Sequence, residues 1–109
     1  MRVRETDPVH EEIVRRIARI AQPERIILFG SRARGQAQST SDYDLLIIQE
    51  SEEPRYRRAV SLYQELADVP AEIDILVYTP AEAAEWSAVP QAFVTTAIRE
   101  GKPVYERKG

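Results

Sequence analysis

Apolar residues in the first part of the chain recur at helical spacing. Asp7-Pro8 suits an N-cap followed by a proline in the first helical turn. The apolar positions that follow are Val9, Ile13, Ile17 and Ile20. Because residues three or four apart share one face of a helix, this pattern predicts an amphipathic helix that ends near Pro23. His10, the only histidine, lies in the first turn of this helix and is expected at the surface.

Three short apolar runs have the composition of buried strands rather than of helices. They cover residues 25–29, 42–48 and 73–78. Continuous runs of this length, rich in Ile, Leu and Val, are typical of strands that are covered on both faces. Residues 102–105 can add a short edge strand, where Pro103 is tolerated.

Helical segments separate these predicted strands. One helix opens at Pro54 and stops at Val69-Pro70. Its predicted inner stripe consists of Tyr56, Val60, Tyr63 and Leu66. Thr79 and Glu82 have the spacing of a capping box, which predicts a helix start at residue 80.

A last predicted helix covers about residues 90–100, and Gly101 suits its C′ position. Strands interleaved with helices predict an α/β (α+β) fold, in which helices flank a small mixed sheet of three to four strands. The length of 109 residues fits a single domain over residues 1–109.

The composition argues against several classes of site and location. The chain has no cysteine, which excludes disulfides, thiolate metal sites and a cysteine nucleophile. Its 15 Lys and Arg residues stand against 18 Asp and Glu residues, so it lacks the basic excess of a protein that coats nucleic acid. No apolar run approaches the roughly 20 residues that span a bilayer. We therefore expect a soluble, cytoplasmic protein that contacts neither nucleic acid nor membrane.

Two aspartates at the head of the second predicted strand are the first candidate for chemistry. Side chains two positions apart on a strand point to the same face, so the carboxylates of Asp42 and Asp44 should lie close together and repel. Hard divalent ions such as Mg²⁺ prefer such oxygen ligands, usually together with phosphate. Alternatively, Asp42 only closes the turn at Ser41 and Asp44 is solvated at a strand end. This pair alone leaves both interpretations open.

A third aspartate, Asp74, interrupts the apolar run 73–78. An isolated charge in a buried strand is unfavourable unless it is paired or bound to a metal. The alternative is an exposed edge position, since Glu72 and Asp74 would share a face. Three carboxylates on neighbouring strands are harder to explain as surface residues than one.

The corner after the first predicted strand, at Gly30 and Ser31, is suited to phosphate. A strand that ends in glycine and turns into a helical segment exposes backbone N–H groups that bind phosphate oxygens. Ser31 adds a hydroxyl group, and Arg32 and Arg34 add positive charge. The spacing matches neither the P-loop nor the dinucleotide-binding motif. An ordinary strand-to-helix turn is the alternative.

Together these features resemble the nucleotidyltransferase superfamily of DNA polymerase β. The matching segments are Gly30-Ser31-Arg32-Ala33-Arg34-Gly35, Ser41-Asp42-Tyr43-Asp44-Leu45 and Ile73-Asp74-Ile75. They are most similar to the minimal nucleotidyltransferases of prokaryotes, whose signature is GSxARG and SDxDL followed by a third aspartate on a later strand. The match extends over residues 26–78 with every signature position filled.

The resemblance implies a role for each signature residue. Asp42 and Asp44 would bind two Mg²⁺ ions, with Mn²⁺ as a substitute, and Asp74 would complete the metal site and help to activate the attacking hydroxyl group. Gly30 and Ser31 would hold the triphosphate of a nucleotide. Arg32 and Arg34 match the motif as further nucleotide-binding residues, although their roles in the family are less uniform.

The resemblance also implies a partner. Minimal nucleotidyltransferases are commonly paired with a helical HEPN toxin, which they neutralise by transferring AMP from ATP to one of its tyrosines. That pairing makes a homo- or hetero-oligomer an expected assembly. The alternatives are a non-catalytic antitoxin that blocks its partner by contact, and a nucleotidyltransferase that acts on a small molecule.

Overall fold

Four strands form one mixed sheet in the computed structural model, which describes residues 8–30 and 42–107. The strands are β1 (Arg25–Phe29), β2 (Tyr43–Ile48), β3 (Ile73–Tyr78) and β4 (Lys102–Glu106), in the order β3-β2-β1-β4. β1 pairs antiparallel with both β2 and β4, whereas β2 and β3 are parallel. The three apolar runs and the edge strand with Pro103 are thus confirmed as strands.

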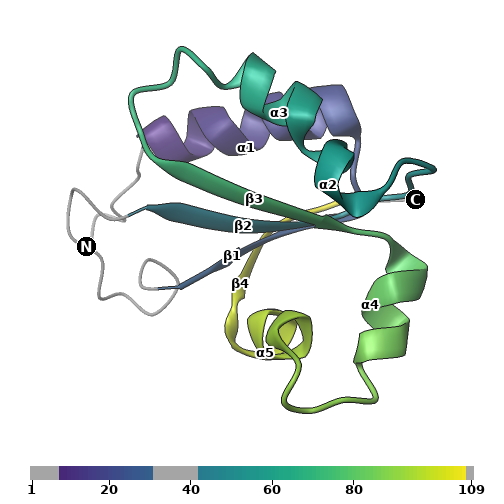
Figure 1. The fold of residues 1–109 in the computed structure, drawn as a ribbon. Helices are drawn as coiled ribbons and strands as arrows, with labels where there is room; N and C mark the ends of the chain where they lie inside the picture. Colours follow the sequence, from purple (N-terminus) through teal and green to yellow (C-terminus); the bar gives the residue numbers. More distant parts are fainter. Residues whose placement is uncertain (1–7, 31–41, 108–109) are drawn as a thin grey trace, which may run out of the picture.

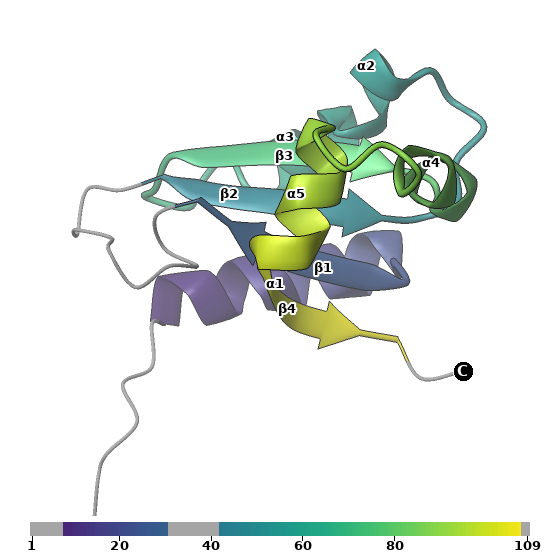
Figure 2. The ribbon, with the colours of Figure 1, turned by 90° about the horizontal axis from the view of Figure 1, so that it is seen from below.

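Helices cover both faces of this sheet (Figure 1). α1 (Pro8–Ala21) and the short α2 (Arg55–Arg58) and α3 (Val60–Glu65) lie on one side, and α4 (Pro80–Trp86) and α5 (Phe93–Glu100) lie on the other. Figure 2 shows α5 lying over the middle of the sheet, with β3 and β4 at opposite edges. The predicted α/β (α+β) fold, with helices flanking a small mixed sheet, is confirmed.

The two helical layers explain why β1 and β2 are continuously apolar over residues 26–29 and 45–48. Alternate side chains of a strand point to opposite faces, and each face here has its own core. One core packs Ile26, Leu28, Leu45 and Ile47 against α1 and α3. The other packs Ile27, Leu46 and Ile48 against α4 and α5. A polar residue in the middle of β1 or β2 would therefore be buried whichever way it pointed.

The helix α1 begins at Pro8 and ends at Ala21, close to the predicted bounds. Ile13 and Ile17 are fully buried, but Ile20 is 40% exposed, so the predicted stripe is shorter than expected. The predicted N-cap Asp7 lies outside the described residues. The expectation that His10 is a surface residue is wrong, because its ring is half-buried and stacks on Tyr43 with 5.9 Å between centroids.

The predicted inner stripe of the second helix is confirmed only at Leu66, whereas Tyr56, Val60 and Tyr63 are exposed. The segment forms two short helices that meet at Ala59, and Tyr56 is 82% exposed. Leu62 and Leu66 are the buried residues, because two leucines four positions apart present a more apolar face than the tyrosines do. The Tyr63 hydroxyl instead accepts a hydrogen bond from the backbone N–H of Ile75 on the edge strand β3 (2.7 Å).

The capping box at the start of α4 is confirmed. The Thr79 hydroxyl accepts a hydrogen bond from the backbone N–H of Glu82, and the Glu82 carboxylate accepts one from the backbone N–H of Thr79. The Glu82 carboxylate also accepts hydrogen bonds from both terminal nitrogens of Arg58, at 2.6 and 3.2 Å. This pair joins α2 to α4 past the end of β3.

The last helix, α5, begins at Phe93 rather than near residue 90. Gly101 follows it as predicted, but its φ of −79° and ψ of 173° are extended and not left-handed. The glycine is needed for space, since a Cβ there would lie 2.4 Å from the Ala97 carbonyl oxygen and 2.6 Å from Cγ2 of Ile27. Within the part of the chain that the structure describes, no helix is long and apolar enough to span a membrane.

Candidate active site

The parallel pairing of β2 and β3 brings Asp44 and Asp74 side by side. They occupy the same register position on the two strands. Asp42 directly precedes β2, two positions before Asp44, and therefore points to the same face of the sheet. One carboxylate oxygen from each of the three residues lies within 4.8 Å of the other two. The structure thus brings together the three aspartates that the sequence analysis selected.

This acidic triad, defined as Asp42, Asp44 and Asp74, lies at one end of the sheet. β2 and β3 begin at that end and β1 finishes there, with Phe29 opposite Asp44 in the antiparallel pair (Figure 1). Along β2, Asp44 alternates with Leu45 and shares its face with Leu46, which packs under α4 and α5. The triad therefore continues the α5 side of the sheet beyond the apolar core.

Burial and mutual repulsion disfavour three negative charges in this arrangement. The pKa of Asp44 is raised above its usual value, first because the carboxyl is partly buried, then because of the negative charges of Asp74 and Asp42. Asp42 and Asp74 are exposed. A cation bound among the three would remove the repulsion, and their oxygens are the hard donors that Mg²⁺ prefers. The donor set thus fits a divalent metal.

Gly30 lets the end of β1 approach the triad closely. Its φ of +78° is left-handed, and a Cβ added to it would lie only 2.4 Å from Oδ2 of Asp44. A glycine is required at this corner for both reasons. The corner that the sequence analysis proposed for phosphate binding therefore starts beside the carboxylates. Its other predicted residues, Ser31, Arg32 and Arg34, lie outside the described residues.

The alternative interpretation of Asp74 describes its location correctly. β3 is an edge strand, and Asp74 is exposed on it. The same position faces Asp44, so Asp74 is both exposed at the edge of the sheet and part of the carboxylate cluster. For Asp44 the alternative is wrong, because this side chain is half-buried rather than freely solvated.

A comparison with protein families bears directly on this arrangement. The sequence profile of the family described as polymerase beta, nucleotidyltransferase matches residues 11–109, nearly the whole chain. The chain belongs to this nucleotidyltransferase family. The resemblance drawn from the signature segments is thereby confirmed, and the acidic triad lies within the matched region.

Solved structures share the fold of this nucleotidyltransferase domain. One is a candidate nucleotidyltransferase from Sulfolobus solfataricus, with 22% identity and a TM-score of 0.65, covering 92% of this chain and 79% of that one. Another is a toxin–antitoxin complex with AMP-PNP, with 22% identity and a TM-score of 0.57, covering 90% of this chain and 74% of that one. No curated protein sequence matches the chain.

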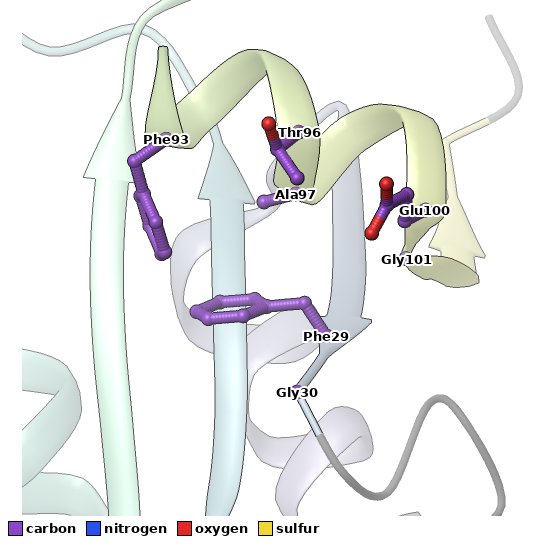
Figure 3. A pocket seen from close by; sticks show the side chains of 7 residues that line it. All are labelled: Phe29, Gly30, Phe93, Thr96, Ala97, Glu100 and Gly101. Carbon is purple, nitrogen blue, oxygen red and sulfur yellow. The ribbon is translucent and has the colours of Figure 1, made fainter. Parts of the chain in front are cut away.

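A small cavity adjoins the acidic triad and was not predicted from the sequence. It has a volume of about 260 Å³ and lies between the end of β1 and α5, with Gly30 in its wall (Figure 3). Phe29 and Phe93 line it from these two elements. The sequence did contain one sign of this cavity, because Phe93, Thr96 and Glu100 have helical spacing and share one face of α5. No local sequence pattern, however, indicated that this face of α5 packs beside β1.

Proposed function

We propose that this chain is a Mg²⁺-dependent nucleotidyltransferase that transfers AMP from ATP to a tyrosine hydroxyl of a helical HEPN toxin and so acts as its antitoxin. The observation that carries the proposal is the acidic triad in a nucleotidyltransferase domain. Carboxylates that repel one another are unfavourable for stability, so their presence favours a metal-dependent activity over a purely structural role.

Each residue of the site has a distinct part in this proposal. Asp42 and Asp44 hold two Mg²⁺ ions, and Asp74 completes the metal site. Bound metal would stabilise the entering and leaving oxygens of the transfer. Gly30 and Ser31 hold the triphosphate, and Arg32 and Arg34 add positive charge beside it. A carboxylate with exposed oxygens, such as that of Asp74, can also accept a proton.

The proposed reaction is an in-line displacement at the α-phosphorus of ATP. The hydroxyl oxygen forms a bond to this phosphorus while the bond to the bridging oxygen breaks, and pyrophosphate leaves with the bonding electron pair. Asp74 accepts the hydroxyl proton. The products are the AMP ester of the acceptor and pyrophosphate.

A second protein is the proposed source of the acceptor hydroxyl. Asp42 and Asp74 are exposed at the end of the sheet, so a docked surface can reach them. Alignment of the reacting groups supplies much of the rate in group transfer, and an exposed site needs a partner to align the acceptor. A fold shared with a toxin–antitoxin complex that contains AMP-PNP supports a partner of this kind.

Intact mass spectrometry tests this proposal. The protein is incubated with its neighbouring gene product and Mg-ATP, and the partner is then weighed. We expect additions of AMP units to the partner that are absent with Asp74→Asn. A matched control is Glu72→Gln, which neutralises a carboxylate near the same end of β3 outside the acidic triad and should leave the additions unchanged. An unmodified partner that is nevertheless bound and inhibited would favour the contact-only antitoxin.

Ser31→Ala should weaken ATP binding without eliminating it. One hydroxyl hydrogen bond to a charged phosphate contributes roughly 1.5–3 kcal/mol, and the backbone N–H groups of the corner are retained in the variant. Calorimetric titration with Mg-ATP measures the loss. Unchanged affinity would mean that the serine makes no phosphate contact.

A further inference from the structure

The cavity beside the acidic triad has walls of two chemical kinds. Figure 3 shows the Phe29 ring facing α5, with Phe93 near the start of that helix and Glu100 near its end. The two rings meet edge to face, with 5.3 Å between centroids. Phe93 is 54% exposed, so part of its ring is accessible to a ligand. Thr96 and Glu100 supply the polar groups of the wall.

The position of the cavity ties it to the nucleotide site. Gly30 forms part of its wall, and the missing Cβ of this glycine would touch the Asp44 carboxylate. Phe29 precedes Gly30 and shares the sheet face of Ile27, which is the face that carries the acidic triad. A ligand whose phosphates lie at the acidic triad would therefore have its other end within reach of the cavity.

The chemistry of the cavity wall favours the base of a nucleotide over its phosphates. The Glu100 carboxylate, which also pairs with Arg99 at 3.5 Å, accepts hydrogen bonds and therefore favours an amino group over a phosphate. The Thr96 hydroxyl can donate to a ring nitrogen. Aromatic side chains provide stacking surfaces for bases. A volume of about 260 Å³ lies below the roughly 300–1,000 Å³ of pockets for drug-sized ligands, which suits a base rather than a whole nucleotide.

We propose that this cavity binds the adenine base of ATP, with the ring against Phe29 and Phe93 and the 6-amino group donating to Glu100. This inference rests on the proposed function and extends it by naming the residues that select the base. Adenine carries an exocyclic amino donor next to a ring acceptor, which matches Glu100 and Thr96. Hypoxanthine carries a carbonyl oxygen in place of that amino group, which Glu100 would repel.

Calorimetric titration of the full chain with three Mg²⁺-bound probes tests the assignment. The probes are ATP, inosine triphosphate and inorganic tripolyphosphate, which has no base. We expect Phe93→Ala to bind ATP and inosine triphosphate about tenfold more weakly and tripolyphosphate as tightly as the wild type. We expect Glu100→Gln to reduce the preference for ATP over inosine triphosphate by about fivefold.

Two variants of residues that do not line the cavity serve as matched controls. Tyr56→Ala removes an exposed aromatic ring on α2, on the other side of the sheet, and Glu85→Gln neutralises an exposed carboxylate on α4. Neither should change the affinity for any probe. Because the Glu100 side chain is 61% exposed, Glu100→Gln should fold even if Phe93→Ala does not.

The outcomes separate this inference from the proposed function. Wild-type affinity of Phe93→Ala and Glu100→Gln for ATP would overturn the base pocket and leave the proposed function standing. An equal loss of ATP and tripolyphosphate binding in Phe93→Ala would also overturn it, because the ring would then act on the phosphate site. A wild-type protein that binds none of the three probes would overturn both proposals.

Discussion

Asp44→Asn is expected to reduce nucleotide transfer by about 100-fold or more, the effect of removing one charge-stabilising group from an active site. Asp44 is central because it lies between the other two members of the acidic triad, two positions after Asp42 and opposite Asp74 in the sheet. The amide keeps the size of the carboxylate but removes the charge that a divalent ion requires. Transfer to the partner, measured by intact mass, checks the prediction.

The same variant should be at least as stable as the wild type in the presence of a chelator. Without a metal, replacing the half-buried Asp44 carboxylate relieves its repulsion by Asp42 and Asp74. A thermal melt of both proteins in metal-free buffer measures the difference, and Glu72→Gln is the matched control. Full transfer activity in Asp44→Asn would contradict the metal site, and a large fall in Tm would show that the carboxylate has a structural role.

Glu82→Gln should destabilise the fold by about 3 kcal/mol at neutral pH, because it leaves the buried Arg58 guanidinium without its counter-charge. The Arg58 side chain is only 8% exposed and donates to both Glu82 oxygens. Glutamine keeps the size of the side chain and can still accept from the Thr79 backbone, so the charge is the main change. Denaturant unfolding at pH 7 measures the loss.

The pH dependence of this loss follows from the pKa of Glu82. The hydrogen bond from Arg58 is the main reason that this pKa falls from 4.5 to about 2, with help from the Thr79 backbone and the Arg55 charge against an opposing effect of burial. Because the folded pKa lies below the unfolded one, the stabilisation is complete above about pH 4.5 and is lost as the pH falls toward 2. The difference between variant and wild type should shrink over that window.

Glu65→Gln is the matched control for this stability series. Glu65 pairs with Arg19 at 3.5 Å, and the side chains are 37% and 65% exposed. Exposed pairs of this kind contribute little to stability, so this variant should unfold close to the wild type at every pH. An equal destabilisation of Glu82→Gln at pH 2 and pH 7 would contradict the ion pair and assign the loss to the shape of the side chain.

The strands and the capped start of α4 could be predicted from local sequence, whereas the break at Ala59 and the buried face of the helices after β2 could not. The run 26–29 is apolar at every position, and such a run is typical of a strand whose two faces are both covered. The segment after Pro54 contains tyrosines that are apolar in the ring and polar at the hydroxyl. Whether such a ring is buried depends on the surfaces around it, and Tyr63 uses its hydroxyl to bond to β3 instead.

The candidate site likewise could be predicted only in part from local sequence, and the rest depends on the pairing of distant strands. The pair Asp42 and Asp44 is visible in the sequence, because two positions along a strand return to the same face. The place of Asp74 beside them depends on the parallel register of β2 and β3, which aligns residues thirty positions apart. The sequence could rank Asp74 as a candidate, but only the sheet pairing puts its carboxylate next to that of Asp44.

The sequence by itself determined the identity of the strands, the mixed layered fold, the family signature and the residues that carry charge at the site. Only the tertiary structure decided that Gly30 leaves space for the Asp44 carboxylate, that His10 stacks on Tyr43, and that Phe29 and α5 line a cavity next to the acidic triad. Periodicity and turn chemistry act over a few residues and can be read along the chain. Strand register and the packing of α5 on β1 arise from contacts between distant segments, which no local pattern records.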